Sequence, residues 1–171
     1  MHRKYWEYAF IAQALSERGM LEPGRRGLGF AVGNEPLVAL FASLGCEVLA
    51  TDLPPEHEDA QCWADSGQHM QNASLLNRSR ICSKKKFEQR VQSRYVDMNV
   101  LPSELTGFDF IWSSCSIEHL GSIDHGKYFI EKMTRCLKPG GVAVHTTEWN
   151  VNSEHETIDT GMAVLFRKKD I

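Results

Sequence analysis

The feature that most constrains the fold is a strand, a short helix and a second strand within residues 26–52. Arg26 to Val32 is a short apolar run between glycines, which is typical of a buried strand. Apolar residues at helical spacing predict a helix over residues 37–44 that ends at Gly45, and Cys46 to Thr51 reads as the second strand. A unit this compact predicts two parallel strands joined by a right-handed crossover.

Strands and helices also alternate along the rest of the chain. We expect Asn34 to cap the helix of residues 37–44, and two short helices within the polar segment 56–93. A proline and two glycines predict a turn over residues 138–141. Further helices are expected at residues 4–19 and 124–137, and further strands at 94–98, 108–113 and 142–147. This alternation predicts an α/β fold with an open parallel sheet.

Composition limits the class of protein. The 171 residues are expected to form one domain over residues 1–171. A net charge of −3 argues against a nucleic-acid or anionic-membrane partner, and no apolar run approaches the roughly 20 residues of a membrane span. The first ten residues lack the apolar core of a secretory signal. Five cysteines without a CxxC pair favour reduced thiols in the cytoplasm, and the histidine spacing predicts no metal site.

The glycine-rich turn after the first strand is the first candidate binding element. Glycines over residues 27–33 would let backbone N–H groups and a helix start approach a ligand closely. Asp52 ends the second strand, where a carboxylate can accept hydrogen bonds from both hydroxyls of a ribose. Taken alone, the glycines could form a tight structural turn, and Asp52 could start the turn before Pro54.

The order of these motifs resembles the class I S-adenosylmethionine-dependent methyltransferases. The resemblance covers roughly residues 20–150. It rests on the glycine turn, Asp52, Val96-Asp97-Met98, Phe108 to Ser113, Ser116 to Leu120, and Leu137-Lys138-Pro139-Gly140-Gly141. It implies a Rossmann-like sheet with strand order 3-2-1-4-5 and flanking helices. It also implies S-adenosyl-L-methionine as the cofactor and methyl transfer to a small-molecule acceptor.

The resemblance assigns cofactor contacts by position. Gly33 would face the methionine part, Asp52 would hold the ribose, and Asp97 would accept from the adenine amine. The other assigned residues would flank the adenine (Leu53, Met98) or lie beneath the cofactor (Ser114, Cys115). The family's glycine pattern places Ala31, Gly33 and Glu35 at its three glycine positions, and Gly29 where the family has an acid. Glu35 would then bind the ammonium or ribose of the cofactor, or serve only as a first-turn helix acid.

Candidate acceptor-side residues follow the second, fourth and fifth strands. His119 and His145 are the candidate catalytic bases, needed only if the acceptor must lose a proton. Glu118 would contact the acceptor, orient His119 or be structural. Gln68 and His69 would contact the acceptor, and their segment is similar to one in methyltransferases encoded beside sugar-transfer enzymes, which suggests a sugar or glycan precursor. The alternative for this segment is a solvated polar loop.

The chain ends before the C-terminal strand hairpin of the family. We therefore expect a C-terminally shortened domain whose last strand, residues 142–147, has an open edge. A homodimer or the chain's own tail would cover that edge. Two other functions stay open: a non-catalytic module that binds S-adenosylmethionine or a partner, and a fragment of a nicotinamide-dependent oxidoreductase.

Overall fold

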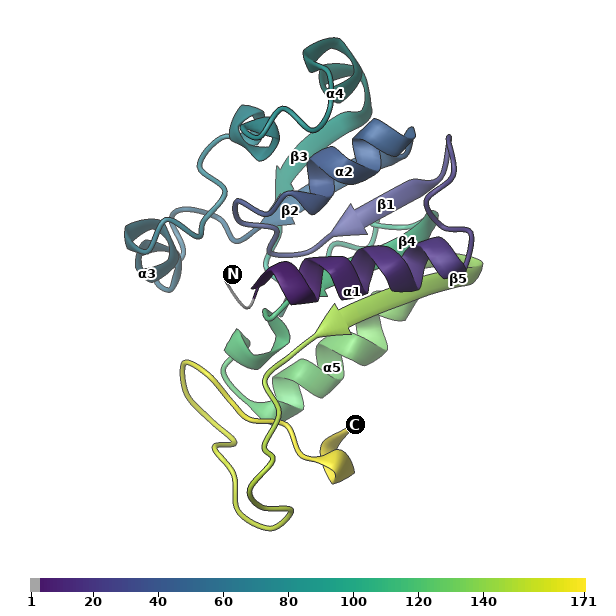
Figure 1. Ribbon diagram of the computed structural model, residues 1–171. Helices are drawn as coiled ribbons and strands as arrows, with labels where there is room; N and C mark the ends of the chain where they lie inside the picture. Colours follow the sequence, from purple (N-terminus) through teal and green to yellow (C-terminus); the bar gives the residue numbers. More distant parts are fainter. Residues whose placement is uncertain (1–3) are drawn as a thin grey trace.

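Helices cover both faces of a parallel sheet in the computed structural model, which describes residues 4–171 (Figure 1). The sheet order is β3-β2-β1-β4-β5, and neighbouring strands of this sheet all run parallel. This confirms the predicted α/β fold and its strand order. The strands are β1 (Arg26–Gly29), β2 (Glu47–Asp52), β3 (Val91–Tyr95), β4 (Phe108–Ser114) and β5 (Leu137–Thr146).

Two apolar clusters separate the three layers. Helices α1 (Lys4–Glu17), α2 (Leu37–Leu44) and α4 (Lys84–Arg90) pack on one face, and α5 (Ile123–Met133) packs on the other. Helix α3 (Ala60–Asp65) lies beyond the strand ends (Figure 1). The 3₁₀ turns are η1 (Ala73–Asn77), η2 (Ile117–His119), η3 (Thr134–Cys136) and η4 (Lys168–Asp170). No helix within residues 4–171 is long and apolar enough to cross a membrane.

Glycines in β1 make room for aromatic rings of the neighbouring strand. Gly27 pairs with Phe110, and Gly29 pairs with Trp112. A methyl group on Gly27 would overlap the Phe110 ring, and one on Gly29 would overlap the Trp112 indole. Both rings are fully buried. These two glycines are therefore required by core packing at the centre of the sheet.

Several element boundaries differ from those predicted. Strand β1 ends at Gly29, three residues early, because the chain turns at Ala31 with φ +48°. Strand β3 begins at Val91 rather than residue 94, since α4 passes directly into the pairing with β2. The predicted N-cap is wrong: Pro36 is the N-cap of α2, and the Asn34 amide donates to the carbonyl oxygen of Gly67 instead. Gly45 ends α2 with φ +105°, as predicted.

The predicted turn at residues 138–141 is an irregular part of β5. Leu137 pairs with Phe108 and Val142 pairs with Phe110. Between these two pairs β5 advances by five residues while β4 advances by two. Gly140 has φ +79°, the left-handed conformation that glycine adopts without strain. The proline and glycines therefore form an excursion within the strand, and the regular pairing resumes at Val142.

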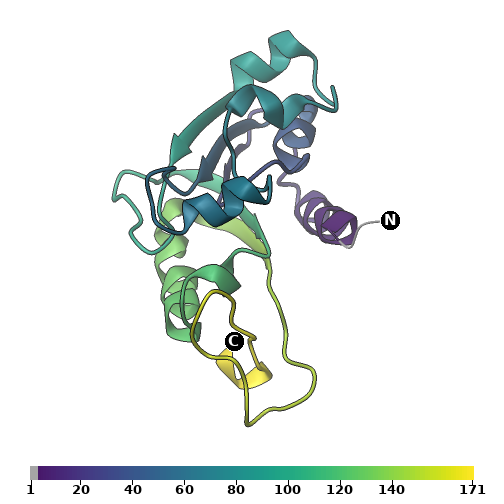
Figure 2. The same ribbon diagram turned by 90° about the vertical axis from the view of Figure 1, so that its left-hand side faces the viewer.

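The C-terminal segment, residues 147–171, folds back over α5 and η2 (Figure 2). Val164 and Phe166 are fully buried, and the Phe166 ring packs where a side chain at Gly126 would lie. Phe166 also bridges to Trp149 within the segment. Across residues 4–171, β4 is the one strand paired with β5. The tail therefore covers a helix and leaves the outer edge of β5 unpaired; a homodimer through that edge stays a prediction.

We expect Gly27→Ala to lower the free energy of unfolding by about 1–3 kcal/mol, because the added methyl must displace the Phe110 ring. Urea unfolding of Gly27→Ala, Phe110→Leu and the double variant measures this effect. The double variant should be more stable than the sum of the single changes. Strict additivity would show that the ring and the glycine are not in contact.

Candidate functional site

A cavity of about 680 Å³ lies at the carboxyl ends of the strands. Its volume falls within the roughly 300–1,000 Å³ of small-molecule sites. Its walls come from the β1–α2 turn, the ends of β2 and β4, residues 96–99, the start of α1 and the α3 region. The predicted site residues that line it are Ala31, Gly33, Glu35, Asp52, Leu53, Gln68, Asp97, Met98, Ser114, Cys115 and His119.

Asp52 joins three backbone segments at the end of β2. Its Oδ2 accepts hydrogen bonds from the N–H of Gly33 (3.2 Å) and of Met70 (2.8 Å), and its Oδ1 accepts from the N–H of Leu53 (2.9 Å). Burial raises the pKa of Asp52, and these N–H groups oppose that rise. A carboxylate has about four acceptor positions, so one remains for a ligand hydroxyl.

The segment of residues 66–70 covers the glycine turn. Gly33 has φ +51°, and a side chain there would overlap the carbonyl oxygen of Gln68. The Asn34 amide donates to the carbonyls of Gly67 (2.8 Å) and His69 (3.2 Å). Only glycine therefore satisfies both the backbone conformation and the close approach at position 33.

His69 connects the segment of residues 66–70 to the ends of β2 and β3. Its Nε2 lies 2.8 Å from the carbonyl oxygen of Leu53, and its ring stacks on Tyr95 with centroids 6.2 Å apart. His69 is 3% exposed and does not line the cavity, whereas the neighbouring Gln68 does. The structure thus separates two residues that were predicted to share a role.

Glu35 reaches the cavity from the start of α2. Its Oε1 accepts a hydrogen bond from the Trp112 indole. Burial raises the pKa of Glu35 to about 8, although the Trp112 hydrogen bond acts in the opposite direction. The group is therefore largely protonated at neutral pH, and a cation in the cavity would favour its ionised form.

Residues 96–99 form the wall opposite the glycine turn. Met98 is 5% exposed and packs with the apolar cluster under α5, while Leu53 lies at the adjacent end of β2. The Asp97 carboxylate accepts from the N–H of Asn99 (2.8 Å) and also lines the cavity. This wall combines two apolar side chains with one acceptor, an arrangement suited to a flat heterocycle.

The start of α1 closes the cavity at the end of β4. Glu7 Oε2 accepts from the hydroxyls of Ser114 (2.9 Å) and Thr146 (3.3 Å), and Lys4 lies 3.6 Å from it. Burial raises the pKa of Glu7, but hydrogen bonds from Cys115 and Ser114 outweigh that effect and hold it below its usual value. Sequence reasoning missed Tyr5 and Tyr8 of this helix, which line the main cavity, and Glu7, which lines a second cavity.

The two candidate bases occupy different environments. His119 lines the cavity beside Trp63, with ring centroids 4.6 Å apart. Its Nδ1 lies 2.7 Å from the carbonyl oxygen of Met162, which favours the tautomer with the proton on Nδ1. Nε2 is then the nitrogen that can accept a proton.

His145 sits within β5 and lines neither of the two cavities described here. Its Nδ1 contacts the Ser113 hydroxyl at 2.8 Å, and its Nε2 is buried without a hydrogen-bond partner within residues 4–171. Burial lowers the pKa of His145 to about 4. Gly29 and Glu118, also predicted site residues, likewise do not line the main cavity.

A family model described as "Methyltransferase domain" matches residues 28–145. A search of curated protein sequences gives no match. Among solved structures, a putative sarcosine dimethylglycine methyltransferase from Galdieria sulphuraria is similar at 18% identity and TM-score 0.60, with 82% of this chain and 46% of that chain covered.

Two further solved structures share the fold. CalS10 from Micromonospora echinaspora, an S-adenosylmethionine-bound amino pentose methyltransferase, gives 18% identity, TM-score 0.59, and coverage of 86% of this chain and 52% of that chain. The [4+2]-cyclase SpnF gives 19% identity, TM-score 0.61, and coverage of 91% and 52%. The chain thus spans about half the length of these proteins, and at this identity the similarity establishes the fold alone.

We expect Glu35 to make folding stability depend on pH. Between pH 4.5 and about 8 the folded chain holds a proton on Glu35 that the unfolded chain has lost. The free energy of unfolding therefore contains a Glu35 contribution that falls as pH rises through this window. Thermal unfolding from about pH 5 to about pH 9 should show Glu35→Gln gaining stability relative to wild type as pH rises. The exposed Glu47→Gln is the matched control, and parallel curves for wild type and Glu35→Gln would contradict the assignment.

Proposed function

Because the chain belongs to the methyltransferase domain family, we propose that it binds S-adenosyl-L-methionine in the 680 Å³ cavity and transfers its methyl group to a small-molecule acceptor. The observation that carries the proposal is the hydrogen bond between Gly33 and Asp52 at the carboxyl ends of β1 and β2. This hydrogen bond links the glycine turn to Asp52 at the end of β2, and both residues lie within the segment that the family model matches.

The lining residues support one orientation of the cofactor. Asp52 has an acceptor position left for a ribose hydroxyl. Leu53 and Met98 would enclose the adenine, and Asp97 would accept from its amine. The methionine end would then lie toward the glycine turn, where Ala31 and Glu35 line the cavity. A positive ammonium there favours ionisation of Glu35.

Methyl transfer needs positioning more than acid–base chemistry. The cofactor supplies a methyl group on a positively charged sulfur. Ser114 and Cys115 would line the cavity near that sulfur, and the chain would hold the acceptor in line with the methyl carbon. Where the acceptor carries a proton, Nε2 of His119 would receive it, since the Met162 carbonyl keeps the other ring nitrogen protonated. The position of His119 in the cavity favours it over His145 for this role.

The acceptor is proposed to be a small molecule, a sugar or glycan precursor. Gln68 is exposed and lines the cavity, so a polar acceptor could reach it. CalS10, which shares the fold, is described as an amino pentose methyltransferase. A cytoplasmic location and a homodimer through the open edge of β5 belong to the same proposal. The family fold also occurs in the cyclase SpnF, so turnover has to be measured separately from binding.

We expect the chain to bind S-adenosylhomocysteine, the demethylated product, at micromolar concentration in isothermal titration calorimetry. Asp52→Ala should abolish this binding, because it removes the ribose acceptor and frees three backbone N–H groups. Asp97→Ala, which gives up one backbone hydrogen bond, should weaken binding about tenfold while the chain stays folded. The exposed Asp124→Ala is the matched control.

The outcomes separate the competing functions. Binding of NAD in place of S-adenosylhomocysteine would decide for an oxidoreductase fragment. Binding of S-adenosylhomocysteine with no methyl transfer to any sugar or other small acceptor would favour a non-catalytic binding module. No binding of either ligand by the folded wild type would overturn the proposal.

A further inference from the structure

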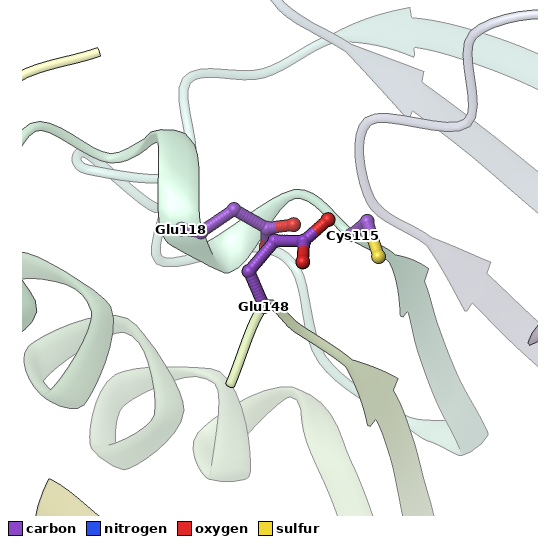
Figure 3. Close-up of side chains that lie close together, drawn as sticks. All are labelled: Cys115, Glu118 and Glu148. Carbon is purple, nitrogen blue, oxygen red and sulfur yellow. The ribbon is translucent and has the colours of Figure 1, made fainter. Parts of the chain in front are cut away.

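Three metal-ligating side chains meet beside the main cavity, although the sequence spacing predicts no metal site. Cys115 follows β4, Glu118 lies in η2, and Glu148 follows β5. The Cys115 sulfur and one carboxylate oxygen of each glutamate all lie within 4.8 Å of one another. In Figure 3 the carboxylates of Glu118 and Glu148 extend toward Cys115, and the three side chains lie close together.

The buried carboxylate of Glu118 belongs to this cluster. Glu118 is 0% exposed, and its Oε2 accepts from the Thr147 hydroxyl at 3.0 Å. Its Oε1 is buried and has no hydrogen-bond partner among residues 4–171. Leaving a buried carboxylate oxygen unsatisfied is costly, so a native fold that retains one requires an explanation. A cation between the three side chains supplies the missing partner.

The backbone holds Cys115 in an unusual conformation. Cys115 has φ +47°, a left-handed conformation that is uncommon for a residue with a side chain. Its N–H donates to the carbonyl oxygen of Thr146 (3.0 Å) and to its hydroxyl (3.1 Å), which fixes the residue against β5. Backbone strain of this kind is concentrated at functional sites, where it presets the direction of a side chain.

We propose that Cys115, Glu118 and Glu148 bind one zinc ion. Zinc takes thiolate and carboxylate ligands at about 2.3 Å and about 2.1 Å, which places tetrahedral ligand atoms about 3.5 Å apart. The observed spacing is at most 4.8 Å, so zinc binding would draw the three ligand atoms closer together. Magnesium and calcium prefer oxygen ligands alone, so the thiol selects a softer divalent ion.

The arrangement leaves a fourth coordination position, as in catalytic rather than structural zinc sites. Cys115 and Glu148 line a second cavity of about 370 Å³, together with Trp6, Glu7 and Trp149. Water or a ligand oxygen can reach the ion from this cavity. Cys115 also lines the main cavity, so the ion would lie between the two. Zinc binding itself does not depend on the proposed methyl transfer.

Titration of the chelator-treated chain with Co²⁺, a spectroscopic substitute for zinc, tests the proposal. We expect one equivalent of Co²⁺ to produce a thiolate-to-cobalt charge-transfer band and the strong visible bands of four-coordinate cobalt, both removed by added Zn²⁺. Cys115→Ser should lose the charge-transfer band. Glu118→Gln and Glu148→Gln should each weaken Zn²⁺ binding at least about tenfold.

Controls make each outcome decisive. Cys62→Ser removes an exposed thiol outside the cluster and should leave the spectrum unchanged. Circular dichroism checks that each variant folds. If Cys115→Ser does not fold, Glu148→Gln, which changes a partly exposed residue, serves as the test. The proposal fails if wild type shows no charge-transfer band or if folded Cys115→Ser keeps it. It fails equally if Glu148→Gln binds Zn²⁺ as wild type does.

Discussion

The carboxylate of Asp52 is the interaction on which the main cavity depends. It accepts backbone N–H groups from the glycine turn, from its own strand end and from the segment over the turn. These three segments come from different parts of the sequence. Burial raises the pKa of Asp52, and those N–H groups oppose that rise. The hydrogen bonds that hold the cavity walls together therefore also favour the ionised carboxylate.

The sheet could be predicted from the sequence because its signals are local. Apolar runs between glycines mark the strands, and helical spacing up to Gly45 marks α2. The boundaries that were wrong depend on long-range contacts. Val91 belongs to β3 because it pairs with Val48, and Asn34 leaves the helix start because residues 67 and 69 offer carbonyl groups. No short window of sequence contains those partners.

The candidate site could be predicted in part for the same reason. The rule that ligands bind at the carboxyl ends of parallel strands selects the end of the sheet where the main cavity lies. It does not say which side chains at that end face the cavity, so His119 lines it while His145 and Gly29 do not. Glu7 and the cluster around Glu118 have no local signal at all. Their proximity is created by α1 and by the turn after β5.

The close packing of β1 against β4 also limits how the sequence can evolve. The rings of Phe110 and Trp112 occupy the space of side chains at Gly27 and Gly29. A lineage can therefore acquire a larger residue at 27 or 29 only after the ring opposite has become smaller. The reverse order passes through an overpacked intermediate. Among diverging relatives, these two pairs of positions should covary, with the change on β4 preceding the change on β1.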